Sequence, residues 1–171
     1  ICIFLLGWVK TVFAVPALVL IALALWEHRK KLRAEYSASS AVLIHPVMLI
    51  LVGIFCVLFC VLCGQGAFFQ QPSDWDKHNR VLNDLVFHQW PVCYHNDSEK
   101  AMLTYYIAQY LIPALCGKIT SSFRVAEIAL LLCNAVGLFC VVLLLFRVVK
   151  AATPKKQIVT ILVFAFFGTC L

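Results

Sequence analysis

The sequence predicts an all-α fold: a polytopic bundle of transmembrane helices whose large outer loop carries two interfacial helices. Composition is the first reason, because the 171-residue chain is 63% hydrophobic and only 13% charged, and its mean hydropathy is +0.94. A soluble globular domain carries far more charge. The second reason is pattern, because long apolar runs alternate with short basic links. We expect residues 1–171 to form one transmembrane domain.

Three apolar segments reach the roughly 20 residues that a transmembrane helix needs. A fourth, residues 158–171, is apolar but too short to span. Because this segment stops with the sequence and residue 1 is not methionine, we expect the chain to be a fragment, the N-terminal portion, of a longer protein. The three full-length spans are expected over residues 1–26, 41–63 and 125–149.

Basic residues set the expected orientation, because lysine and arginine in short loops are retained on the cytoplasmic side. The links at residues 29–33 and 147–156 each carry four of them. Residues 64–124 hold five basic and five acidic residues, so this loop is expected outside. The net charge of +6 therefore belongs mainly to the inner links and does not indicate nucleic-acid binding. The short loops favour a bacterial cytoplasmic (inner) membrane.

The outer loop begins with a charged segment, DWDKHN at residues 74–79. Apolar residues recur at helical spacing over residues 75–90, with polar residues in the other directions, which predicts an amphipathic helix along the membrane surface. Asp74 and Asp76 then occupy its first turn, where the helix dipole favours acidic residues without any catalytic role. A second short helix is predicted over residues 99–116.

The order of motifs in this loop resembles the first outer loop of the GT-C class of membrane glycosyltransferases. In both, an apolar span precedes an acidic D-x-D pair, here Asp74 and Asp76, and an interfacial helix. A Tyr-Tyr pair, here Tyr105 and Tyr106, then starts a second short helix that leads to a glycine and another span. Residues 103–127 are most similar to the mannosyltransferase-like branch that uses dolichyl- or polyprenyl-phosphate sugars.

The resemblance implies transfer of a sugar from a polyprenyl-phosphate-linked donor to an acceptor at the outer face of the membrane. It assigns Asp76 first, and Asp74 second, as the base that deprotonates the acceptor hydroxyl, or as ligands of a divalent cation such as Mg²⁺ or Mn²⁺. Lys77 and Arg80 are the nearest cations for the phosphate leaving group. Membrane lipids are the other expected partners. The expected supporting residues are His78, Tyr105 and Tyr106.

Two other classes of protein stay open. A transporter or flippase would use the outer helices as a gate, but transporters place ionisable or helix-breaking residues at mid-membrane. The spans at 41–63 and 125–149 offer few such residues. A non-catalytic membrane subunit would bind a partner through the outer helices, and it would tolerate asparagine at both Asp74 and Asp76. An enzyme would not tolerate at least one of those changes.

Cysteine and histidine do not indicate a metal centre. Seven of the nine cysteines lie in or beside apolar spans, where cysteine acts as a small hydrophobe. His78, His88 and His95 are spaced by ten and seven residues, which matches no zinc signature. A disulfide between Cys93 and Cys116 would need an oxidising compartment, and nothing in the sequence requires it.

Overall fold

The computed structural model describes residues 1–38, 44–95 and 100–168, and these residues are mostly helical. The one sheet in this part of the chain is a pair of short antiparallel strands, in which Tyr94 lies opposite Ala101. The elements in chain order are α1 (Cys2–Trp8), α2 (Thr11–Ala38), α3 (Pro46–Leu62), η1 (Gln65–Ala67), α4 (Asp74–Phe87), β1 (Cys93–His95), β2 (Lys100–Met102), η2 (Ile107–Gln109), α5 (Leu111–Thr120), α6 (Phe123–Val148) and α7 (Pro154–Gly168), where η marks a 3₁₀ helix.

Two of the described helices are long and apolar enough to cross a membrane: α2 over Thr11–Leu32 and α6 over Phe123–Val148. Their length and composition indicate association with a membrane. Helix α3 is more apolar than either but has 17 residues, which is about 25 Å of helix. Helix α6 agrees with the expected span at 125–149, and the Ser122 hydroxyl caps it by accepting a hydrogen bond from the Val125 N–H at 3.4 Å.

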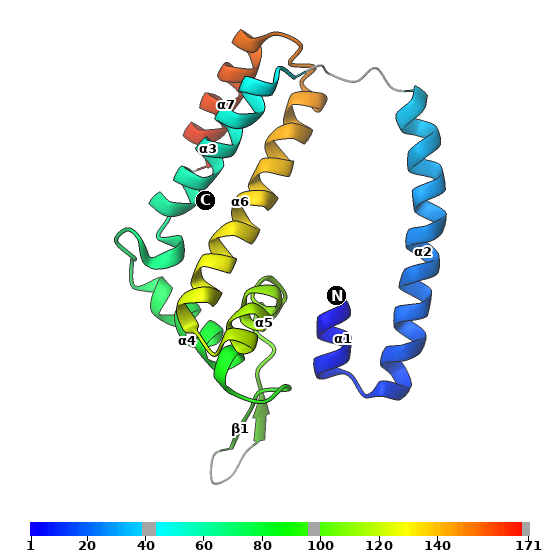
Figure 1. Ribbon diagram of the computed structural model, residues 1–171, viewed down its shortest axis with the longest axis vertical. Coiled ribbons are helices and arrows are strands. Elements are labelled where there is room, and N and C mark those ends of the chain that lie inside the picture. Colours follow the sequence, from blue (N-terminus) through cyan, green and yellow to red (C-terminus); the bar gives the residue numbers. More distant parts are fainter. Residues whose placement is uncertain (39–43, 96–99, 169–171) are drawn as a thin grey trace.

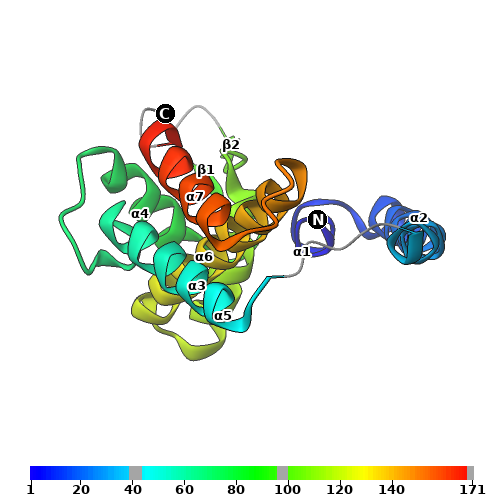
Figure 2. The same ribbon diagram turned by 90° about the horizontal axis from the view of Figure 1, so that it is seen from above.

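Helix α6 runs along the centre of the molecule, with α3 and α7 packed beside it (Figures 1 and 2). Val52 and Cys56 of α3 meet Val142 and Phe146 of α6 in a core cluster of buried apolar side chains. Helix α2 stands apart from these three helices, and α1 lies between them (Figure 2). The long helices therefore do not all pack against one another.

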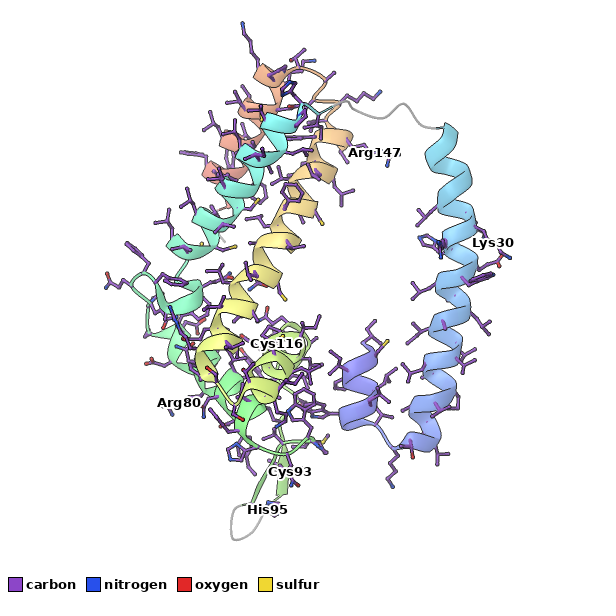
Figure 3. All side chains as sticks on the ribbon, in the orientation of Figure 1. Lys30, Arg80, Cys93, His95, Cys116 and Arg147 are labelled. Atoms are coloured by element: carbon purple, nitrogen blue, oxygen red, sulfur yellow. The ribbon has the colours of Figure 1, made fainter. Side chains whose placement is uncertain are left out.

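The two ends of the molecule differ in character. The end of α2, the start of α3 and the turn between α6 and α7 lie at one end, and α4, α5 and the strands lie at the other (Figure 1). Figure 3 shows Lys30 and Arg147 in the half that holds the basic links, and Arg80 and His95 in the opposite half. We call the end that holds α4 and α5 the loop end.

The expected first span at residues 1–26 is instead two helices. Val9, the residue that ends α1, has an extended backbone, and α2 begins at Thr11. The Trp8 indole donates a hydrogen bond to the Leu103 carbonyl at 3.0 Å, and its ring contacts that of Trp90. These contacts hold α1 against the loop end. Lys10, a charged residue inside the expected span, lies at the break, but the contacts that hold α1 in place come from far along the chain.

The predicted second helix at residues 99–116 is correct only in its last part. Residues 100–102 form strand β2, and helix α5 begins at Leu111. Tyr106 has a φ of 43°, a left-handed conformation that an α-helix cannot include. Pro113 lies in the first turn of α5, where proline costs no helical hydrogen bond. The other predicted short helix is confirmed as α4, although it ends at Phe87.

The loop end has its own core between α4, α5 and α6. Leu82, Leu85 and Val86 of α4 are buried against Ala114 of α5 and Ala126 of α6. This core holds α4 by its apolar side, and the polar sides of the helix face away from the core. The position of α4 is therefore set by packing, and the polar residues on it are held at defined places on the surface.

Candidate functional site

Helix α4 carries two rows of polar side chains that point in different directions. Residues four apart lie on one side of a helix, whereas residues two apart lie about 200° apart around its axis. Asp74 and His78 form the first row, and Asp76, Arg80 and Asp84 form the second. The two aspartates of the D-x-D motif therefore belong to separate surroundings.

The first row is a connected cluster. The Asp74 Oδ1 atom accepts a hydrogen bond from the Lys77 Nζ at 2.9 Å, and Asp74 Oδ2 lies 3.1 Å from His78 Nε2. The His78 Nδ1 atom lies 2.5 Å from the hydroxyl of Tyr110. One tautomer satisfies both histidine contacts: Nε2–H donates to Asp74, and the Tyr110 hydroxyl donates to Nδ1. We call these four residues the Asp74 cluster.

Both oxygens of Asp74 are thus in use. The hydrogen bond from Lys77, and after it the one from His78, lowers the pKa of the Asp74 carboxyl below its ordinary value. The same bond to Asp74, with a smaller contribution from Tyr105, raises the pKa of Lys77. A carboxylate with a lowered pKa and two donors already bound is a poor proton acceptor. Asp74 is better suited to holding its neighbours in place.

Tyr110 is the residue of this cluster that sequence reasoning missed. Its side chain is only 1% exposed, and burial raises the pKa of its phenol. A buried tyrosine hydroxyl needs a hydrogen-bond partner, and this requirement is the signal that could have identified Tyr110 from the sequence. The predicted tyrosines lie further out: the Tyr105 ring is 5.4 Å from Lys77 Nζ, and Tyr106 packs edge-on against Tyr105 but is 71% exposed.

The second row lines an open pocket of about 490 Å³. Within the described part of the chain, neither the Asp76 carboxylate nor the Arg80 guanidinium has a side-chain hydrogen bond or ion pair. Lys77 borders the same pocket, so this residue connects the two rows. The residues around the pocket are Ser73, Asp76, Lys77, Arg80, Val81, Asp84 and Tyr94.

The far end of the pocket is formed by α4 and strand β1 together. The Tyr94 hydroxyl donates a short hydrogen bond to Asp84 Oδ2, and His88 Nδ1 lies 3.9 Å from Asp84 Oδ1. Burial, and then the neighbouring Asp84 carboxylate, raises the pKa of Tyr94 to about 12. Tyr94 is therefore a neutral hydrogen-bond donor at ordinary pH. Sequence reasoning did not include Asp84 or Tyr94 in the site.

The start of α4 is fixed to the end of α3 by side-chain hydrogen bonds. The Trp75 indole donates to the Cys63 carbonyl at 3.0 Å. Gln71 donates to the Gly64 carbonyl at 2.7 Å and accepts from Asn79 of α4 at 2.9 Å. Because these bonds involve the first turns of α4, they set the direction in which Asp74 and Asp76 point.

Arg124, in the first turn of α6, connects this helix to the segment between α3 and α4. Its guanidinium donates to the Gly66 carbonyl at 2.5 Å and pairs with the largely buried Glu127 at 3.0 Å. Its side chain also lies over the Phe68 ring, 4.5 Å from the ring centre. The site is therefore supported from both sides, by α3 and by α6.

A metal held jointly by the two aspartates does not fit this arrangement, because Asp74 and Asp76 point apart. In the described ranges, no three His, Cys, Asp or Glu side chains gather to hold a metal ion. Cys93 and Cys116 both carry free thiols, one on β1 and one on α5 (Figure 3).

Comparison of the chain with protein-family models, characterised proteins and solved structures finds no match. The fold and the site together define a class in coarse terms. The chain is a mostly helical, membrane-associating protein with a polar pocket at one end of its long helices.

Proposed function

We propose that the chain belongs to a polytopic membrane glycosyltransferase of the GT-C class, which transfers a sugar from a polyprenyl-phosphate donor to an acceptor hydroxyl. One observation carries the proposal: the Asp76 carboxylate, without a partner among the described residues, shares an open pocket with Arg80 and Lys77. A base and two cations in one pocket are the groups that this transfer requires. The motif order of residues 56–150 supports the same assignment.

Asp76 is the base in this proposal. Its carboxylate accepts the proton of the acceptor hydroxyl while the hydroxyl oxygen bonds to the first carbon of the donor sugar. The bond between that carbon and the phosphate oxygen breaks, and polyprenyl phosphate leaves with the electron pair. Lys77 and Arg80 stabilise the negative charge that grows on the phosphate. No metal is needed to balance this step.

Asp74 has a positioning role in this proposal. It fixes the Lys77 ammonium at 2.9 Å, at the border of the pocket. His78 and Tyr110 in turn hold Asp74, so Lys77 is tied to the buried core. The Tyr105 ring also contacts the Lys77 ammonium, with its centre 5.4 Å from Nζ. In this proposal Asp76, which the sequence analysis preferred as the base, keeps that role, and Asp74 positions Lys77.

The membrane arrangement that we propose uses the difference between the two ends of the molecule. We place α2, α3, α6 and α7 within the membrane as a polytopic bundle, with the basic links in the cytoplasm and the loop end outside. The donor then binds with its sugar phosphate in the pocket and its chain among membrane lipids. A bacterial inner membrane is the location that we propose.

Sugar transfer from a panel of labelled polyprenyl-phosphate sugars, by membranes that contain the intact protein, tests this function. We expect Asp76→Asn to lower turnover about 100-fold or more, since general bases contribute roughly that much. Glu27→Gln is the matched control, because Glu27 is an exposed acid of α2, a helix that stands apart from α4 (Figure 1). Unchanged turnover in Asp76→Asn would remove this residue from the chemistry. If none of the donors in the panel supports turnover, the result would favour a transporter or a structural subunit.

A further inference from the structure

The pocket beside α4 has an unusual balance of charge. Two acidic residues, Asp76 and Asp84, face two basic ones, Lys77 and Arg80, so the lining carries no net charge. Along the second row the signs alternate, with Arg80 one turn from each aspartate. Its volume of about 490 Å³ lies within the range of about 300–1,000 Å³ that small-molecule sites occupy.

This balance selects among classes of ligand. In the proposed function Lys77 and Arg80 hold the donor phosphate, so a second anion would meet only the carboxylates and be repelled, and a free cation would lie beside the Arg80 guanidinium. An apolar ligand would leave these charged groups without partners. A neutral molecule with many hydroxyls meets neither obstacle, because each hydroxyl can donate to a carboxylate and accept from a guanidinium.

Tyr94 adds a second feature that favours a saccharide. Its side chain is 45% exposed, so its ring offers a flat amphipathic surface beside the pocket. Its hydroxyl occupies only one oxygen of Asp84, and His88 Nδ1 is 3.9 Å from the second, which is beyond hydrogen-bond distance. That second oxygen can therefore accept a ligand hydroxyl.

We propose that Asp84 and Tyr94 form a binding subsite for a neutral saccharide acceptor, and that this subsite recognises the sugar unit next to the one that is attacked. The proposal rests on the proposed function, since Asp76 defines where the attacking hydroxyl lies. Asp76 and Asp84 are eight residues apart, which is about 12 Å along the helix axis. A single sugar ring does not reach that far, so the acceptor has two or more units.

Direct binding to the intact protein in lipid nanodiscs tests the subsite. The probes are neutral methyl glycosides, as single sugars and as disaccharides, with inorganic phosphate as the anionic probe, and the readout is saturation-transfer NMR. We expect a disaccharide to bind. Its Kd should rise about tenfold in Asp84→Asn, as for the loss of a charged hydrogen bond, and also in Tyr94→Ala. Asn83→Ala, an exposed α4 position outside the pocket, is the matched control and should not change Kd.

Two results would overturn the subsite: no glycoside binds, or the disaccharide Kd is the same in both variants and the wild type. Inorganic phosphate should bind independently of Asp84 and Tyr94, because the proposed function places the donor phosphate at Lys77 and Arg80. Circular dichroism and size-exclusion profiles confirm that the variants fold. Tyr94→Phe retains the ring and removes the hydroxyl that donates to Asp84, and it should keep most of the affinity, which separates the contribution of the ring from that of the hydroxyl.

The same variants distinguish a failure of the subsite from a failure of the proposed function. In the transfer assay, Asp84→Asn and Tyr94→Ala should raise the acceptor KM about tenfold and leave the donor KM unchanged, whereas Asp76→Asn should lower kcat. If turnover depends on Asp76 but the acceptor KM does not depend on Asp84 or Tyr94, the subsite is wrong and the function stands. If no donor is used but saccharide binding still requires Asp84, the function is wrong and the subsite stands.

Discussion

The Tyr110 hydroxyl lies 2.5 Å from His78 Nδ1, and this contact joins the buried start of α5 to the charged start of α4. The two residues are 32 positions apart in the sequence. Through His78 the contact extends to Asp74 and then to Lys77 at the pocket. The buried core of the loop end therefore determines where a pocket cation lies.

Tyr110→Phe tests this link. The change removes one hydroxyl from a side chain that is 1% exposed and leaves His78 Nδ1 without its partner. We expect the free energy of unfolding to fall by about 1 kcal/mol, the usual value of one such hydrogen bond. Denaturant unfolding in detergent measures it. Tyr106→Phe is the matched control because Tyr106 is exposed, and an equal loss in both variants would contradict the link.

The Asp74 cluster also predicts a dependence on acid pH. The pKa of Asp74 is lowered in the folded protein from its ordinary value of 3.8, chiefly by Lys77 and then by His78. The stabilisation by Asp74 is therefore present above pH 3.8 and is lost as the pH falls through the lower, folded pKa. Asp74→Asn should be less stable than wild type near neutral pH, with the difference vanishing in acid. Because Asp74 is at the surface, solvent screens the effect and we expect it to be small.

Unfolding midpoints of wild type and Asp74→Asn, measured across this pH range, check the prediction. Lys77→Met supplies the control, because it removes the group that lowers the pKa of Asp74 most. In a Lys77→Met background, Asp74→Asn should cause a smaller pH-dependent difference. A difference that is the same at every pH, or that grows in acid, would show that these contacts do not stabilise the folded protein.

Local pattern was enough to predict α6 and α4. Helix α6 is one continuous apolar run, and α4 shows the helical period of a surface helix. The break after Trp8 and the strand at residues 100–102 could not be predicted in this way. Both depend on partners distant in sequence, since Trp8 bonds to Leu103 and β2 pairs with β1. Local composition contains no information about such contacts.

The same distinction holds for the candidate site. The shared environment of Asp76 and Arg80 could be predicted, because residues four apart lie on one side of a helix. The separation of Asp74 from Asp76 follows from that geometry as well. Tyr110 and Tyr94 reach α4 from other elements, so only the fold places them beside His78 and Asp84. Sequence reasoning chose Tyr105 and Tyr106 instead because they form a recognisable pair.

Lys118 of α5 stabilises the last turn of α4. Its Nζ donates to the Val86 carbonyl at 3.1 Å and to the His88 carbonyl at 2.6 Å. It also lies 5.5 Å from the centre of the Trp90 ring. These carbonyls belong to the end of a helix, where no backbone N–H is available to them. The position of Asp84, one turn before His88, therefore depends on the hydrogen bonds from Lys118.

Lys118→Met should therefore loosen the end of α4. We expect faster amide hydrogen exchange in the last turn of α4, and a fall of about 1–3 kcal/mol in the free energy of unfolding, since hydrogen bonds to a charged donor are lost. Lys155→Met is the matched control, because Lys155 is exposed on α7. If Lys118→Met leaves exchange in α4 unchanged, water replaces the ammonium without cost and the predicted role of Lys118 is wrong.

Gly117 provides the sharpest test of how α5 packs against α6. A Cβ atom at this position would lie 2.7 Å from the Cβ of Ala126 and 2.9 Å from Val86 Cγ2. These separations are too short for carbon atoms, and both neighbours are short side chains within the buried core. Gly117→Ala must therefore push α5 away from α4 and α6. We expect it to cost about 1–3 kcal/mol, as overpacking of a core does.

Gly137→Ala in α6 is the matched control. Nothing lies within 4 Å of the Cβ it would add, so it should leave stability unchanged or raise it slightly through helix propensity. Thermal unfolding of both variants in the same detergent makes the comparison. Because Tyr110 directly precedes α5 and Lys118 lies within it, Gly117→Ala should also lower turnover, whereas Gly137→Ala should not. Equal stability of the two variants would mean that α5 does not approach α6 as closely as the packing of Gly117 requires.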